Sequence, residues 1–139
     1  MLLLDHSAWS RLVADQAPPH RENDVLDWIE DGTLATCLPF LLEAGFSAQD
    51  GLEHSEGMER LDRLSHFPID EAVERAAEQA QSDLARVGHH RMPVTDLMIA
   101  ACAHVAGGGV LHYDRDFDLI LEHTSLRFES VWLAEPGTL

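Results

Sequence analysis

The chain has 139 residues, 45% of them apolar, which predicts one domain large enough to bury a hydrophobic core without disulfides or a structural metal. No apolar run approaches the roughly 18 residues of a membrane span, and Asp5 interrupts the opening leucines before they could form a secretory signal. We therefore expect a cytoplasmic protein without a membrane segment. Its two cysteines, Cys37 and Cys102, lie in apolar segments and are expected to be buried free thiols.

The charge is strongly acidic, with nine basic residues, all arginine, against 25 acidic residues and a net charge of −16 at pH 7. Such a protein repels polyphosphate at long range, so it can act on nucleic acid only where divalent cations neutralise carboxylates locally. The surplus of acid also suggests a basic partner, although solubility alone would explain most of these residues.

Helical and strand patterns alternate almost throughout the chain. The first third of the chain predicts a strand over 1–4, a helix capped by Ser7 that runs to about 13, a helix after the break at 17–19 that ends before Gly32, and a strand over 34–37. The middle predicts a helix opened by Pro39, a helix over 51–64, a strand over 66–69 and a helix over 70–87. The last part predicts an apolar helix from 93 to 105, a turn at 107–109, a strand over 110–113, helical turns over 114–122 and a strand over 126–131. This alternation predicts an α/β domain with a mostly parallel sheet covered on both faces.

Two of the predicted strands end in an aspartate, Asp5 and Asp114. Ligand sites in parallel sheets form outside the carboxyl ends of the strands, so these residues mark the expected position of the chemistry. Glu43 and Asp96 also border apolar segments, and Asp116 follows two residues after Asp114. Burying several carboxylates together is costly unless a cation balances them, and oxygen ligands favour Mg²⁺ or Mn²⁺.

Each acid also has a simpler explanation when it is taken alone. Asp96 could be an ordinary first-turn residue behind a Thr95 cap, Asp116 a turn residue, and Glu43 an exposed helix position. Asp5 and Asp114 are harder to dismiss because each ends a strand. The set of acids therefore indicates a metal site more strongly than any single member does.

The order and spacing of these acids resemble the PIN-domain nucleases, and in particular the VapC-type toxins of bacterial toxin–antitoxin pairs. The resemblance covers essentially the whole chain, and its motifs are Asp5-His6-Ser7, Glu43, the stretch from His90 to Ala101 around Asp96, and Leu111-His112-Tyr113-Asp114-Arg115-Asp116-Phe117-Asp118. It implies a PIN-like three-layer α/β/α sandwich with a mostly parallel central sheet. The implied activity is Mg²⁺-dependent endoribonuclease cleavage that leaves 5′-phosphate and 3′-hydroxyl ends.

On the matching positions, the resemblance makes Asp5 and Asp96 the main metal ligands. Glu43 and Asp114 would complete the cluster of catalytic acids, and Asp116 would support it. As in other metal-dependent nucleases, bound Mg²⁺ would lower the pKa of a coordinated water, and a free cluster carboxylate could accept its proton.

Five further residues flank the acids. Ser7 would orient Asp5 by a hydrogen bond, and Thr95 is expected to support Asp96. Arg91 and Arg115 could hold the RNA backbone, with a surface ion pair as the alternative for both. Position 112 is His, whereas many family members carry Thr or Ser there, so the hydroxyl that would help to position substrate is absent.

The resemblance also implies partners. They are an RNA substrate, a VapB-type antitoxin with a basic segment, and a second copy of the chain in a homodimer. Leu52, Met58 and Leu61 are apolar residues that could serve a dimer interface, although core packing is the simpler and preferred role for them.

Other functions fit less well or stay open. Asp114-Arg115-Asp116 resembles the haloacid-dehalogenase phosphatase motif, but position 118 is Asp and the chain has no lysine, which such phosphatases and receiver domains both need. The absence of a GxxxxGK(S/T) motif excludes a P-loop NTPase. A PIN-like RNA-processing nuclease without an antitoxin, and an inactive PIN-like binding module, remain as alternatives.

Overall fold

The computed structural model describes all 139 residues, and its centre is a five-stranded sheet in the order β3-β2-β1-β4-β5. Every pair of neighbouring strands is parallel. The strands are β1 (Leu2–Leu4), β2 (Leu34–Thr36), β3 (Ser65–His66), β4 (Gly109–His112) and β5 (Glu129–Trp132). The first strand of the chain is therefore the middle strand of the sheet.

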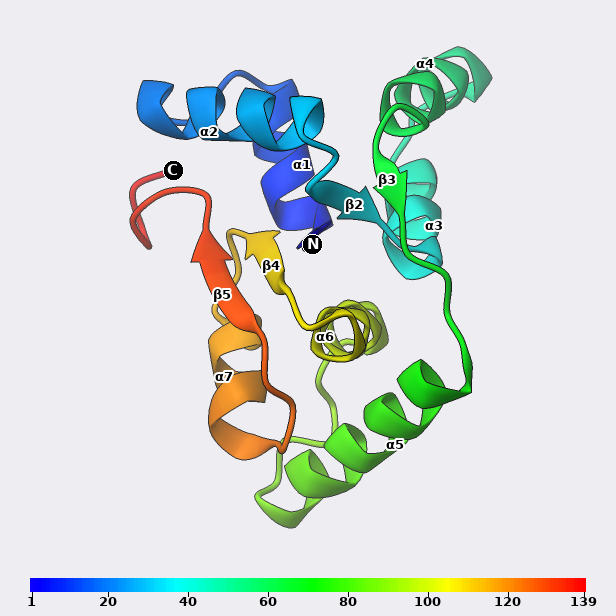
Figure 1. The fold of residues 1–139 in the computed structure, drawn as a ribbon, viewed down its shortest axis with the longest axis vertical. Helices are drawn as coiled ribbons and strands as arrows, with labels where there is room; N and C mark the ends of the chain where they lie inside the picture. Colours follow the sequence, from blue (N-terminus) through cyan, green and yellow to red (C-terminus); the bar gives the residue numbers. More distant parts are fainter.

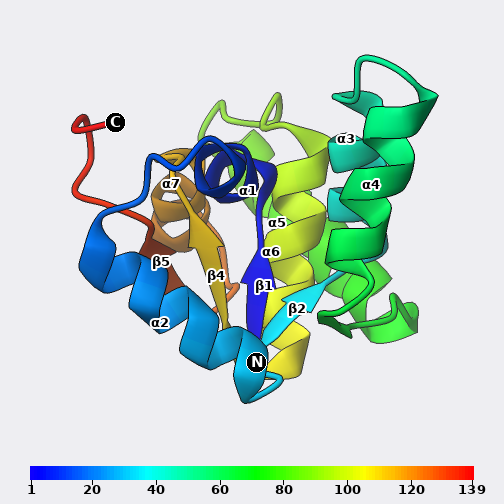
Figure 2. The same ribbon diagram turned by 90° about the horizontal axis from the view of Figure 1, so that it is seen from above.

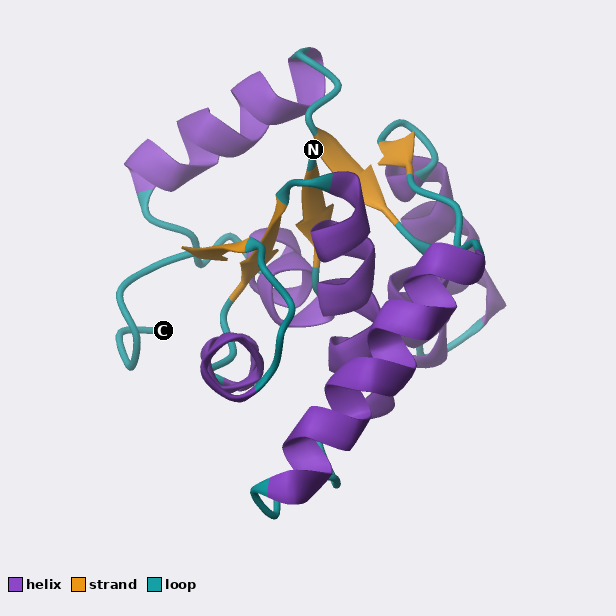
Figure 3. Cartoon of the chain, turned by 60° about the horizontal axis from the view of Figure 1, so that its bottom comes forward, coloured by secondary structure: helices purple, strands orange, loops and turns teal.

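Seven helices connect and cover these strands. They are α1 (His6–Val13), α2 (Pro19–Glu30), α3 (Leu38–Phe46), α4 (Gly51–Leu61), α5 (Glu71–Arg86), α6 (Val94–Ala106) and α7 (Asp116–His123). Helices α1 and α2 cover one face of the sheet, and α6 and α7 cover the other, with α5 packed on the outer side of α6 and α7. Helices α3 and α4 lie beyond the β2–β3 edge (Figures 1 and 2). Figure 3 shows the strands enclosed between the helices. The predicted three-layer α/β/α sandwich is confirmed.

Burial on both faces of the sheet explains why the sequence of the first strand is an uninterrupted apolar run. Leu3 and Leu4 of β1 are fully buried, as are Val110 and Leu111 of β4 and Ile99 of α6. Strands of a parallel sheet that is covered on both faces have no solvent side, so polar residues do not alternate with apolar ones. Both cysteines are buried free thiols, as predicted. No helix combines the length and apolarity that crossing a bilayer requires.

Two predicted strands are displaced in the structure. The strand expected over 66–69 lies at Ser65–His66, because Pro68 has no N–H with which to extend the ladder. The strand expected over 126–131 begins only at Glu129. The N–H of Leu126 donates to Thr124 Oγ1 at 3.1 Å and that of Arg127 donates to His104 Nδ1 at 2.9 Å, so side chains occupy the donors that a strand would use.

The predicted Ser7 cap is wrong, and the Thr95 cap considered for Asp96 is not present either. Asp5, not Ser7, is the N-cap of α1, because its carboxylate accepts from the Ser7 N–H. Pro93, not Thr95, precedes α6, and no side chain caps that helix. Asp96 does lie in the first turn of α6, as the simpler explanation had it, but without a Thr95 cap before it.

Candidate active site

The sheet topology brings Asp5 and Asp114 to one edge. Strands β1 and β4 are parallel neighbours, so their carboxyl ends coincide, and the Asp5 N–H donates to the Leu111 carbonyl at 3.0 Å. Helix α6 packs against both strands and carries Asp96 in its first turn. Helix α3, which contacts α6, carries Glu43. Four acids that are far apart in the sequence thus reach the same end of the sheet.

Three carboxylates form the tightest cluster. Asp96, Asp114 and Asp116 each offer an oxygen atom, and these oxygens all lie within 4.8 Å of one another. Asp96 is buried and the other two are half-buried. A set of hard oxygen donors at this spacing suits a cation such as Mg²⁺ or Mn²⁺. Asp116 is therefore a full member of the cluster, although the sequence indicated only a supporting place for it.

Asp5 lies beside this cluster with only 2% of its surface exposed. Its Oδ2 accepts from the Ser7 N–H at 3.0 Å and from Ser7 Oγ at 2.5 Å. Its Oδ1 is buried and has no hydrogen-bond partner. Because an unsatisfied buried carboxylate oxygen is costly, its presence among other acids fits a site that a cation completes.

Ser7 ties the two strand ends together. While its hydroxyl donates to Asp5, its oxygen accepts from the Tyr113 N–H at 2.8 Å. The hydrogen bond to Asp5 that the resemblance implies for Ser7 is thus present. It connects the end of β1 to the turn that carries Asp114.

Crowding of the acids raises two pKa values. Burial is the main cause that raises the pKa of Asp96, to about 8, and the charges of Asp5, Asp114 and Asp116 add to it. Burial likewise raises the pKa of Asp5, against the opposing hydrogen bonds from Ser7. No arginine forms an ion pair with any of these acids. The chain therefore leaves their charge to be balanced by a ligand.

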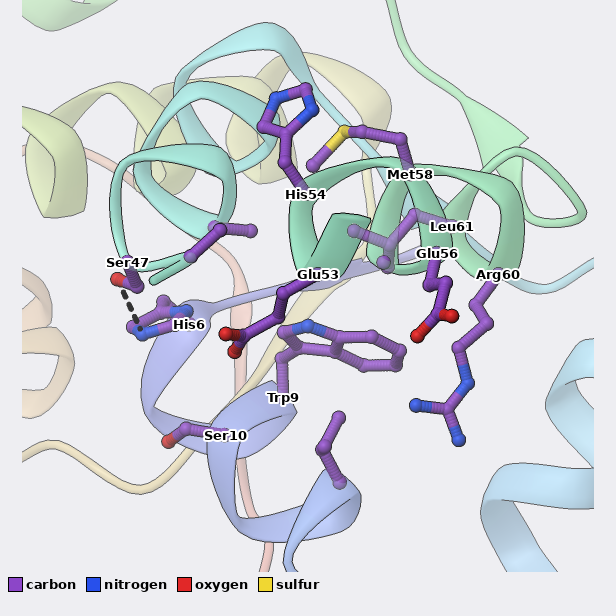
Figure 4. Close-up of a pocket in the computed structure, with 14 residues that line it drawn as sticks. His6, Trp9, Ser10, Ser47, Glu53, His54, Glu56, Met58, Arg60 and Leu61 are labelled. Atoms are coloured by element: carbon purple, nitrogen blue, oxygen red, sulfur yellow. Dashed lines mark hydrogen bonds between the residues drawn. The ribbon is translucent and has the colours of Figure 1, made fainter. Parts of the chain in front are cut away.

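Glu43 is half-buried and lies outside the three-carboxylate cluster, but its charge contributes to the raised pKa of Asp5. It lines a shallow depression together with Thr95, His6, Ser47 and three apolar residues of α3. His6 and Ser47, whose Nε2 and Oγ atoms are 3.1 Å apart, also line a neighbouring pocket between α1 and α4 (Figure 4). No sequence pattern singled out His6, because it reaches the rim of the site only through the packing of α1 against α3.

Arg91 and Arg115 are both exposed, and neither forms an ion pair. The alternative of a surface ion pair is therefore not realised for either residue. Both guanidinium groups remain free for an external anion next to the acidic segments.

Comparisons with known proteins agree with this geometry. The family model of the PIN domain matches residues 2–120. Ribonuclease VapC21 of Mycobacterium tuberculosis is 37% identical over 138 residues, covering 98% of this chain and 96% of the relative. Ribonuclease VapC18 of the same species is 31% identical over 139 residues, covering 98% and 97%.

Solved structures show the same fold at lower identity. The DNA-bound VapBC complex of Salmonella typhimurium contains a chain with a TM-score of 0.71 and 22% identity, covering 94% of this chain and 98% of that one. The VapBC2 complex of Rickettsia felis gives a TM-score of 0.75 at 14% identity, covering 93% and 97%. Together with the family match and the carboxylate cluster, these similarities show that the chain belongs to the PIN domain family, among its VapC ribonucleases.

Proposed function

We propose that this chain is an Mg²⁺-dependent endoribonuclease and the toxin of a toxin–antitoxin pair, acting on RNA in the cytoplasm. The proposal rests on one observation. Several carboxylates converge at the carboxyl ends of β1 and β4, with the buried Oδ1 of Asp5 unpartnered and no arginine to balance them. A bound cation would balance the ionised carboxylates and give Asp5 Oδ1 the partner that it lacks.

Asp96, Asp114 and Asp116 would hold the cation, with Asp5 Oδ1 close by as a further donor. All of these donors are oxygen atoms, which favours Mg²⁺, or Mn²⁺ in its place, over zinc with its preference for nitrogen and sulfur. When bound, Mg²⁺ lowers the pKa of a coordinated water and polarises the scissile phosphodiester.

The chain's own residues then position the reacting groups. Ser7 holds Asp5 in a fixed orientation, so no reorganisation is needed when substrate binds. The carboxylate of Glu43, outside the cluster, is available to accept the proton of the attacking water. Arg91 and Arg115 are free to contact phosphates on either side of the cut.

An apolar groove between α1, α2 and α4 fits an antitoxin segment. Leu26 is 63% exposed and Ile29 is 40% exposed along it. The groove adjoins the pocket of Figure 4, because Trp9 lines both. That pocket in turn adjoins the depression at Glu43, because His6 lines both. A partner lying in the groove can therefore extend a basic side chain to the acidic site. The related structures are themselves VapBC complexes.

The outer face of α3 is the best candidate for a homodimer interface. Leu38, Leu42 and Phe46 recur at helical spacing and are 52%, 64% and 90% exposed. Of the residues that the sequence suggested, Leu61 is buried and Met58 packs against the core, whereas Leu52 is 70% exposed and could extend the interface.

The first test is RNA cleavage. We expect Asp5→Asn and Asp96→Asn each to lower the rate of Mg²⁺-dependent cleavage of total RNA by at least about 100-fold, because each removes negative charge that the cation requires. Asp27→Asn, a change of the same kind on the exposed side of α2, should leave the rate unchanged. Binding of RNA without cleavage by the unmodified protein would favour the inactive binding module instead.

The pH dependence of stability gives a second test. Because the pKa of Asp96 is raised from 3.8 to about 8, the folded state binds more protons than the unfolded state between these pH values. The free energy of unfolding of metal-free protein should therefore fall, by an amount on the order of a few kcal/mol, as pH rises from about 4 to 8. Urea unfolding at pH 5 and pH 8 measures this difference. Asp96→Asn or saturating Mg²⁺ should reduce it, and an unchanged difference in both would contradict the metal site.

Antitoxin binding gives a third test. Co-expression with the product of the adjacent reading frame should yield a stable complex. Leu26→Asp and Ile29→Asp should each weaken it by at least about tenfold, since each places a charge in the groove. Cleavage by the isolated chain should not change, and Val87→Asp, at an exposed apolar position at the end of α5, should have no effect. Failure to co-purify would favour an RNA-processing nuclease without an antitoxin.

The oligomeric state gives a fourth test. Light scattering of the isolated chain should give the mass of a dimer, and Phe46→Asp should give the mass of a monomer because it places a charge in the centre of the apolar face. Val87→Asp serves again as the control. A dimer that survives Phe46→Asp would assign the interface to another surface.

A further inference from the structure

Beyond the carboxylates themselves, the most completely connected polar group near the site is His112, the last residue of β4. It is fully buried, and its ring lies 4.8 Å from the ring of Phe117 and 4.8 Å from that of Trp132, centroid to centroid. Its backbone is fixed as well, because His112 pairs with Trp132 in the β4–β5 ladder and its carbonyl accepts from the Leu133 N–H at 2.7 Å. The ring thus has one available orientation.

Both ring nitrogens are hydrogen-bonded, and the partners define the tautomer. The Asp114 N–H, which can only donate, lies 3.1 Å from Nδ1, so Nδ1 carries no proton. Nε2 therefore carries the proton and donates to Ser130 Oγ at 2.7 Å. Burial lowers the pKa of His112 to about 4, which agrees with a neutral ring.

The chain of hydrogen bonds continues to an anchor outside the core. Ser130 Oγ donates to Asp118 Oδ1 at 2.6 Å, and Trp132 Nε1 donates to Asp118 Oδ2 at 3.0 Å. Every group in this chain has a donor or acceptor role that it can fill. The ring is consequently fixed from β5 and α7 at one side while it holds the Asp114 amide at the other.

The Asp114 amide belongs to the turn that supplies two of the three clustered carboxylates. Asp114 Oδ1 in turn accepts from the Asp116 N–H at 2.9 Å. When all three acids are ionised, as metal binding requires, like charges within 4.8 Å repel each other, so the turn needs an anchor to stay beside Asp96. A Thr or Ser hydroxyl at position 112 could bond the same amide, but it could not also reach Ser130.

We propose that His112 is a positioning residue of the metal site: its Nδ1 holds the Asp114 amide, and through Ser130, Asp118 and Trp132 it keeps the carboxylates of Asp114 and Asp116 facing Asp96. This role rests on the metal site of the proposed function. His112 takes the place of the hydroxyl that the sequence lacks and does not itself contact the reacting atoms.

The test is the affinity of the metal-free protein for Mn²⁺, measured by isothermal titration calorimetry, together with thermal unfolding of each variant. His112→Leu should weaken Mn²⁺ binding by about tenfold or more, the range seen when groups that orient metal ligands are removed. His112→Asn, whose side-chain oxygen can still accept from the Asp114 amide, should recover most of this loss. Ser130→Ala, which removes only the outer anchor, should fall between His112→Leu and the unmodified protein.

His104 provides a matched control. Its Nδ1 also accepts a backbone N–H, from Arg127 at 2.9 Å, but it lies about 12 Å further along α6 than Asp96, by the helical rise. His104→Leu should lower the unfolding temperature without changing Mn²⁺ affinity.

Three results would overturn the role of His112. They are a folded His112→Leu that binds Mn²⁺ as the unmodified protein does, equal losses in His112→Leu and His104→Leu, or no recovery in His112→Asn. If His112→Leu does not fold, unchanged affinity in Ser130→Ala overturns it. An unmodified protein that binds no Mn²⁺ contradicts the metal site itself and this role with it, whereas equal binding by all variants contradicts only the role of His112.

Discussion

The mutual repulsion of carboxylates in a partly dehydrated site is the interaction on which the rest of the structure depends. Each acid resists burial, and each raises the cost of ionising the next, as the raised pKa values of Asp5 and Asp96 show. Such a cluster persists only if rigid elements hold it. Here β1, β4 and α6, the most deeply buried parts of the core, hold the acids at their ends, so hydrophobic burial stabilises an arrangement that electrostatics alone would disperse.

The groups that orient the acids are neutral. Ser7 bonds Asp5 and the Tyr113 amide, and His112 bonds the Asp114 amide. The three ion pairs that arginines form lie within α2, α5 and its C-terminal turn, away from the cluster. These neutral groups orient the acids without cancelling their negative charge, so the charge remains available to an external cation. The same property would let a basic side chain of an antitoxin compete for the charge that a metal ion balances.

Local patterns in the sequence carried enough information for the fold and for four of the acids. The apolar run before Asp5, the strand before Asp114 and the apolar helix after Asp96 indicate their positions because burial is a local property of these segments. The apolar segment around Glu43 marked that residue in the same way, and it lies beside the cluster rather than in it. Asp116 was expected to support the site, and the position of its carboxylate within the cluster depends on the geometry of a turn.

Other features could not be predicted because they depend on contacts between distant segments. The late start of β5 reflects His104, on α6, accepting the Arg127 N–H. The position of His112 between Phe117 and Trp132 depends on the register of β4 against β5. The N-cap of α1 is Asp5 rather than the predicted Ser7, although either residue type can cap a helix. In the structure the Ser7 hydroxyl oxygen accepts from the Tyr113 N–H, a contact with a distant segment that the local sequence does not indicate.

The strong acidity of the chain is compatible with an RNA substrate because charge acts over different distances. At physiological ionic strength the Debye length is about 8 Å, so most of the net charge of −16 is screened from a phosphate that approaches the active site. Such a phosphate would meet the local set of carboxylates, near which the exposed Arg91 and Arg115 lie in the sequence. A divalent cation held by the cluster would neutralise two of these charges and present a positive centre to the phosphate, while the distant surface charge stays in place. The net charge of the chain therefore affects the association rates of charged partners. Binding of a divalent cation to the carboxylate cluster would determine whether an RNA phosphate can bind there.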